Sequence, residues 1–180
     1  MRDGTGIVKA LVVYESMWGN TEQIARAVAA GLGESHQVEV LDVAEAPTNP
    51  GPDVQLIVAG GPTHAFSMSK PASRADAHTR GAQHGSAGVG LREWLDQLPA
   101  GDHHQVIATF DTKVSKVRYL PGAARSAGKA AAEHGYRRAA HAESFLVQDM
   151  EGPLVEGELE RATQWGRQIA IAATRSLSGA

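Results

Sequence analysis

The sequence predicts an α/β protein built on a doubly wound parallel sheet. Unbroken apolar runs of strand length recur along the chain, and such runs are typical of strands that are buried on both faces. They alternate with segments whose apolar residues return every three or four positions, as they do in amphipathic helices. This alternation predicts parallel strands joined by crossover helices. We expect a five-stranded sheet in the order 2-1-3-4-5.

The first strand and helix follow one another closely. Residues 11–14 read Leu-Val-Val-Tyr, and from Thr21 the apolar positions change to the helical period. Further strands are expected over Gln37–Val43, Val54–Ala59, Gln105–Phe110 and Glu143–Val147, and further helices around Leu91–Leu98, Gly122–His134 and Glu156–Leu177. We interpret residues 1–6 as a loose tail and residues 7–180 as a single domain with a long loop at about 67–90.

Composition excludes several classes of function. With 180 residues, 42% of them hydrophobic, the chain is long enough for one well-covered core. The absence of cysteine excludes disulfides, thiolate catalysis and cysteine-ligated metals, and the eight histidines form no H-E-x-x-H motif, so no metal site is expected. A net charge of -3 gives no reason to expect a nucleic-acid partner. Without an apolar run of membrane-spanning length or a secretory signal, we expect a cytoplasmic protein with no membrane partner.

The turn between the first strand and helix is suited to an anion. The first backbone N–H groups of a helix are unpaired and lie at its positive end, so a phosphate bound there collects several donors. Ser16, Asn20 and Thr21 add hydroxyl and amide groups, and no lysine or arginine lies in the turn. A terminal monophosphate therefore fits better than a triphosphate. The alternative is that these residues only cap the helix and shape the turn.

The same residues carry a family resemblance. The pattern Val12-Val13-Tyr14-x-Ser16-x-x-Gly19-x-Thr21, followed by Ala25 and Val28, resembles the signature of the flavodoxin family. The resemblance implies a flavodoxin-like three-layer sandwich with flavin mononucleotide (FMN) as cofactor. It also implies that the first loop grips the FMN phosphate, with Ser16, Met17, Trp18, Gly19, Asn20 and Thr21 as the binding residues.

Two later segments resemble the other flavin loops of the family. Gly60-Gly61-Pro62-Thr63-His64 is similar to the second loop, which makes Pro62, Thr63, His64 and Phe66 candidates for flavin contacts. Phe110, Asp111 and Thr112 are the candidates in the third loop. Two of these candidates have alternatives: His64 can be an ordinary loop histidine, and Phe66 can be a packing residue. Tyr119, further along the chain, is either a second stacking ring or a packing residue.

The resemblance leaves three functions open. The first is a redox protein that passes electrons through bound FMN to a redox partner protein. The second is a flavoenzyme of the NAD(P)H:quinone reductase kind, and the third is a flavodoxin-like binding scaffold without a cofactor. Basic side chains beside the flavin would attract anionic partners such as NAD(P)H, although they can equally be solvated loop charges. The candidates are Lys70, Arg74, Lys113, Lys116 and Arg118. The sequence leaves the oligomeric state and the choice between carrier and oxidoreductase open.

Overall fold

The computed structural model describes residues 8–179, so the expected tail over residues 1–6 lies outside the described residues. Its central sheet confirms the predicted topology. Five parallel strands lie in the order β2-β1-β3-β5-β7, which is the expected order 2-1-3-4-5. They are β1 (Lys9–Tyr14), β2 (Gln37–Asp42), β3 (Val54–His64), β5 (Val106–Val114) and β7 (Glu143–Val147).

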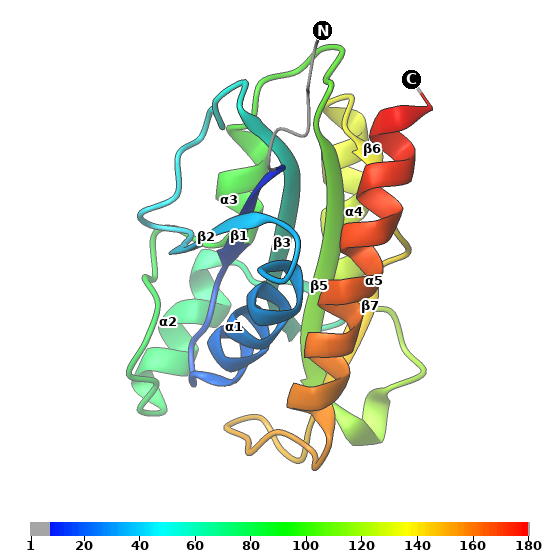
Figure 1. Cartoon of the computed structure of the whole chain (residues 1–180). Helices are drawn as coiled ribbons and strands as arrows, with labels where there is room; N and C mark the ends of the chain where they lie inside the picture. The colour runs from blue at the N-terminus through cyan, green and yellow to red at the C-terminus, as the bar shows by residue number, and fades with distance from the viewer. Residues whose placement is uncertain (1–7, 180) are drawn as a thin grey trace, which may run out of the picture.

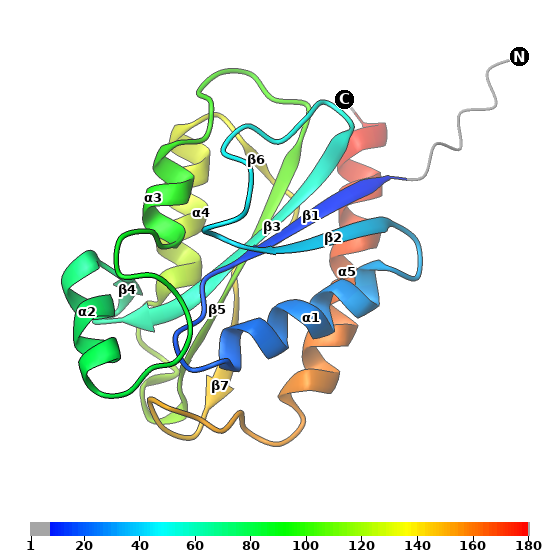
Figure 2. The same ribbon diagram turned by 90° about the vertical axis from the view of Figure 1, so that its left-hand side faces the viewer.

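Helices cover both faces of this sheet and complete three layers (Figure 1, Figure 2). Helices α1 (Asn20–Leu32) and α5 (Glu158–Ser178) pack on one face, while α3 (Leu91–Asp96) and α4 (Ala123–Glu133) pack on the other. Within residues 8–179, none of the helices has the length and apolar character needed to cross a bilayer.

The unbroken apolar run of β1 results from burial on both sides. Val12 and Tyr14 join the core under α1 and α5, whereas Leu11 and Val13 join the core under α3 and α4. Successive side chains of a strand point to opposite faces, so a central strand needs apolar residues at every position.

The fifth position of the sheet is divided between two strands. Short β6 (Arg137–Arg138) pairs with the beginning of β5, and β7 pairs with its end. The sequence predicted β7 but not β6, because two exposed arginines carry no apolar strand pattern.

Strands β3 and β5 continue beyond the points where their apolar patterns end. Gly60 pairs with Phe110 and Pro62 with Thr112, so segments predicted as loops are paired strand. A Cβ on Gly60 would overlap the Phe110 ring, so glycine is needed there for the two strands to pair closely. The strand prediction was therefore too short because glycine and proline interrupt the apolar pattern without interrupting the ladder.

The segment 67–90 is not one long loop. It begins with β4 (Ser67–Met68), which pairs antiparallel with the end of β3, and continues into α2 (Pro71–Thr79). After a two-residue link at residues 69–70, the remaining loop is residues 80–90, which we call the α2–α3 loop. Ala65 and Phe66 connect β3 to β4 with φ angles of 47° and 65°, a left-handed conformation that is strained for residues with a side chain.

Candidate functional site

A cavity of about 240 Å³ lies where β1, β3 and β5 end. Its walls come from the β1–α1 loop, the end of β3, helix α2, the end of β5 and the β7–α5 loop (residues 148–157). It brings together most of the predicted cofactor-binding residues, namely Ser16, Met17, Trp18, Asn20, Thr21, Pro62, Thr63, His64 and Thr112. Open α/β sheets place their ligands at this edge, outside the carboxyl ends of the strands.

The β1–α1 loop, residues 15–19, presents an uncapped helix start to the cavity. Gly19 occupies the N-cap position with φ 86°, and no side chain caps the helix. The Ser16 hydroxyl oxygen accepts a hydrogen bond from the Gly19 N–H at 3.1 Å, which shapes the loop. The next backbone bond runs from Gln23 N–H to Gly19 O at 3.2 Å, so the N–H groups before Gln23 have no partner one helical turn back. Gly19 does not line the cavity, but it gives the loop its shape.

Two side chains tie the start of α1 to distant segments. The hydroxyl oxygens of Thr21 and Thr112 lie 2.7 Å apart, so the beginning of α1 is hydrogen-bonded to β5. The Asn20 amide donates to the Glu151 carbonyl oxygen at 3.1 Å, which joins α1 to the β7–α5 loop. The cavity therefore depends on contacts among three segments that lie far apart in the sequence.

His64 and helix α2 form the opposite wall. The His64 Nδ1 lies 2.9 Å from the Ser73 hydroxyl oxygen. Burial lowers the pKa of His64, and the positive charge of Arg74 lowers it further against the opposing effect of Asp76. His64 is accordingly neutral near pH 7. Asp76 also lines the cavity, and its carboxylate is paired with Arg80 at 2.9 Å.

A buried polar network fixes the α2 segment against the β1–α1 loop. Glu15 accepts hydrogen bonds from the Ser69 hydroxyl at 2.5 Å and from the Leu91 N–H at 2.7 Å. Arg74, whose exposed fraction is 0%, donates to Ser69 at 2.8 Å and pairs with Glu93 at 3.0 Å. Burial raises the pKa of Glu15, although its hydrogen bonds and Arg74 favour the charged form. The network holds one wall of the cavity in place without touching the cavity.

Phe66 and Phe110 do not line the cavity. Phe110 is fully buried and packs edge to face on Phe145 and Trp165, with ring centroids 6.2 and 6.1 Å away. Its side chain lies in the core under α1 and α5, on the face of β5 that it shares with Thr112, because residues two apart on a strand point to the same face. Phe66 is 52% exposed on the turn after β3, while its neighbour Ala65 lines the cavity.

Asp111 points to the opposite face of β5 from Thr112 and stabilises the start of α4. Its Oδ2 accepts a hydrogen bond from the Ala124 N–H at 2.8 Å, at the positive end of α4. Its Oδ1 is buried and has no hydrogen-bond partner among residues 8–179. Burial raises the pKa of Asp111, although the hydrogen bond from the Ala124 N–H, the nearby Ser144 and Thr63 hydroxyls and the charge of Lys113 oppose the rise.

The expected ring of basic side chains is only partly present. Arg74 is fully buried, and buried Lys113 donates to the Leu120 carbonyl oxygen at 3.0 Å, so neither is available to a partner. The prediction was wrong for these two because each charge holds a neighbouring segment in place. Lys70, Lys116 and Arg118 are exposed.

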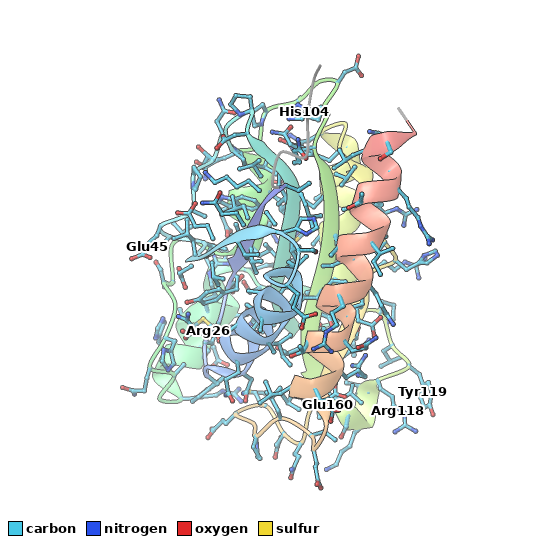
Figure 3. The ribbon with its side chains drawn as sticks, viewed as in Figure 1. Arg26, Glu45, His104, Arg118, Tyr119 and Glu160 are labelled. Carbon is cyan, nitrogen blue, oxygen red and sulfur yellow. The ribbon has the colours of Figure 1, made fainter. Side chains whose placement is uncertain are left out.

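Tyr119 does not line the cavity either. It is 84% exposed and lies against the Arg118 guanidinium, 4.7 Å from the ring centroid. Figure 3 shows both side chains pointing outward at the lower right of the molecule.

Sequence reasoning missed part of the cavity wall. Helix α2 contributes Ser73, Asp76 and Ala77, and Pro71 in its first turn was an available start signal. The other residues that it missed carry no local signal, because only the tertiary fold brings them to the cavity: Ala65, Val114, Val147 and Met150.

Comparisons with known proteins agree with this geometry. The family profile of flavodoxins matches residues 12–80, which include the β1–α1 loop, the end of β3 and α2. No curated protein matches the sequence significantly. Among solved structures, a flavodoxin from the domain Archaea aligns with a TM-score of 0.62 at 19% identity, covering 93% of this chain and 99% of its own. Flavodoxin 1 from Bacillus cereus aligns with a TM-score of 0.65 at 16% identity, covering 91% of this chain and 97% of its own.

A larger protein contains the same architecture. The flavodiiron protein from Giardia intestinalis aligns with 95% of this chain at a TM-score of 0.59 and 15% identity, and 37% of that chain is covered. Identities this low establish the fold alone. The protein is therefore flavodoxin-like, with the flavodoxin fold along the described chain and the sequence pattern of the flavodoxin family over residues 12–80.

Proposed function

We propose that this protein binds FMN in the cavity and transfers electrons through it to a redox partner protein. The observation that carries the proposal is the uncapped start of α1, with the hydroxyls of Ser16 and Thr21 beside it in the cavity wall. The family match over residues 12–80 supports FMN as the ligand.

The lining of the cavity fits the three chemical parts of FMN. Free N–H groups and neutral hydroxyls suit a terminal phosphate, because a helix start offers several donors and a positive end. The Thr112 hydroxyl, which has Thr21 as its one side-chain partner among residues 8–179, retains hydrogen-bonding capacity for a polyol chain. Apolar surface suits the flat ring system, and it comes from Met17, Trp18, Pro62, Ala65, Ala77, Val114, Val147 and Met150.

Bound FMN supplies the redox chemistry, and this chain supplies binding and surroundings. Ser16, Thr21 and the first turn of α1 would hold the phosphate. Trp18, Pro62 and Met150 would shield the ring from water, which strengthens every electrostatic interaction inside the cavity. The Glu15–Arg74 network keeps the α2 wall at a fixed distance from the β1–α1 loop.

The electron carrier is preferred over the NAD(P)H:quinone reductase. The reductase interpretation depended on basic side chains around the flavin, and two of the five, Arg74 and Lys113, are buried in structural contacts. The cytoplasmic location stays a prediction from the sequence.

Titration of the protein with FMN tests the proposal. Thr21→Val keeps the shape of the side chain and removes its hydroxyl, so we expect FMN affinity to fall by about tenfold, as for the loss of one hydrogen bond to a charged group. Thr48→Val, at an exposed loop position, serves as the control and should bind FMN like the native protein. Absence of FMN binding by the native protein, followed by fluorescence quenching, would contradict the proposal.

The same preparation separates carrier from reductase. FMN-loaded protein is mixed with NADPH without oxygen while the visible flavin absorbance is recorded. A carrier keeps its absorbance with NADPH and loses it on stepwise chemical reduction. Rapid bleaching by NADPH would establish the reductase instead.

A further inference from the structure

The Ser73 hydroxyl makes three polar contacts beside the cavity. It lies 3.0 Å from the Lys70 carbonyl oxygen, to which it donates, and it accepts from the Lys70 N–H at 3.0 Å. The third contact is to His64 Nδ1 at 2.9 Å. Both Lys70 contacts belong to the first turn of α2, so the position of the hydroxyl is fixed by the helix.

The single proton of the Ser73 hydroxyl determines which nitrogen of the neutral His64 ring is protonated. A hydroxyl carries one proton and can accept two hydrogen bonds. If that proton is donated to Lys70 O, then His64 Nδ1 must be the donor in the third contact. The opposite assignment, with Ser73 donating to His64, loses the bond to Lys70 O. All three contacts are therefore hydrogen bonds only when Nδ1 carries the proton of the neutral ring.

The other ring nitrogen faces different surroundings. Nε2 forms no hydrogen bond to a protein atom within residues 8–179, and the His64 side chain lines the cavity. In a neutral ring with its proton on Nδ1, Nε2 offers a lone pair and no proton. The hydroxyls in the cavity wall are compatible with a lone pair at Nε2, because hydroxyls donate as well as accept. The Asp76 carboxylate does not require a proton on Nε2, because it is already paired with Arg80. Nε2 is thus an acceptor that has no partner from the protein.

We propose that Ser73 holds His64 as the Nδ1–H tautomer, so that Nε2 accepts a hydrogen bond from an N–H or O–H group of the ligand. The assignment of the tautomer stands on the protein alone. Its consequence for the ligand rests on the proposed function, because FMN carries such donors, an N–H group on its ring system and O–H groups on its polyol. Ser73 is then a positioning residue, which acts through His64.

Nitrogen-resolved NMR of the FMN-free protein tests the tautomer directly. At pH 7.5 we expect Nδ1 of His64 to show the shift of a protonated ring nitrogen and Nε2 that of an unprotonated one. The His64→Gln spectrum identifies the signals among the eight histidines. In Ser73→Ala the ring loses its acceptor and should move toward the Nε2–H tautomer that an unconstrained imidazole favours. A protonated Nε2 in the native protein, or an unchanged tautomer in Ser73→Ala, would overturn the assignment.

A pair of variants tests the contact with FMN. His64→Asn keeps an N–H near Ser73 and removes the acceptor at the Nε2 position, so we expect FMN to bind about two- to tenfold more weakly. His64→Gln places an amide oxygen near the Nε2 position and should retain affinity within about twofold of the native value. Native affinity in His64→Asn, with folding verified by circular dichroism, would disprove the contact. If the native protein does not bind FMN, the proposed function fails, whereas the NMR result still decides the tautomer.

Discussion

Buried charges at single residues carry much of the site's architecture. Arg74 contributes no surface, yet it contacts Ser69, Glu93 and the carbonyl oxygen of Ala87. The sequence could not reveal this burial, because an arginine in a polar segment has the pattern of a solvated charge. Ser16 and Thr21 were predictable, since a strand followed at once by a helix places them at a helix start.

Replacing Arg74 tests the importance of the network. In Arg74→Met, Glu15 and Glu93 lose their buried cation, and we expect the free energy of unfolding to fall by about 3–5 kcal/mol. Urea denaturation followed by circular dichroism measures the change. Arg80→Met, at the C-cap of the same helix but with its ion pair exposed, is the control and should change stability by less than about 1 kcal/mol. Equal losses in the two variants would contradict the structural role of Arg74.

The raised pKa of Asp111 predicts that the stability of the protein depends on pH. Burial raises the pKa of Asp111, so the folded protein binds this proton more readily than the unfolded chain does. Stability from this group is present at low pH and is lost as pH rises from the ordinary value of 3.8 through the raised pKa. Asparagine cannot titrate, so Asp111→Asn should become more stable relative to the native protein as pH rises from 4 to 8.

Urea titrations at several pH values measure that trend. Asp53→Asn provides the contrast, because a hydrogen bond from Lys9 lowers the pKa of the exposed Asp53 carboxylate. Its relative stability should therefore not improve with pH. A constant difference between Asp111→Asn and the native protein over this range would exclude a raised pKa for Asp111.

At the level of elements, glycines set the distance between α1 and α5. A Cβ on Gly166 would overlap the Val28 carbonyl oxygen of α1, and one on Gly31 would overlap the Thr163 carbonyl oxygen of α5. The two backbones therefore pack closely where each helix has a glycine.

Gly166→Ala should destabilise the protein although alanine favours a helix more than glycine does. The overlap forces the helices apart, and we expect a loss of about 1–3 kcal/mol, as for overpacking in a core. Thermal and urea unfolding measure it. Gly88→Ala, in the α2–α3 loop with only Ser86 nearby, is the matched control and should change stability by at most about 0.5 kcal/mol. A neutral Gly166→Ala would show that the interface adjusts freely.

Helices and strands with a buried apolar face could be predicted from the sequence. Elements without such a face could not be predicted. The range of β7 agrees with the prediction over Glu143–Val147, α1 begins one residue before the predicted Thr21, and α5 differs from its predicted range by two residues or fewer at each end. In contrast, β4 and β6 have two residues each, and their pairing with β3 and β5 depends on neighbours that the local sequence does not specify.

For the whole molecule, the alternation of strands and helices was sufficient to predict the sheet order, because parallel strands with right-handed crossovers permit few topologies. The cavity was less predictable. The sequence identified its walls at the ends of β1, β3 and β5, where ligands of such sheets bind. It did not identify the wall from the β7–α5 loop, since the approach of Met150 to the cavity depends on how the last third of the chain packs.

The hydrogen bond between Asn20 and Glu151 spans 131 positions of the sequence. During synthesis a chain emerges from its N-terminus, so the β1–α1 loop leaves the ribosome long before the segment that covers it. A nascent chain that ends before Met150 contains most of the cavity wall but lacks that side. The cavity wall is therefore complete only after the segment that contains Met150 has been synthesised and has packed against the start of α1.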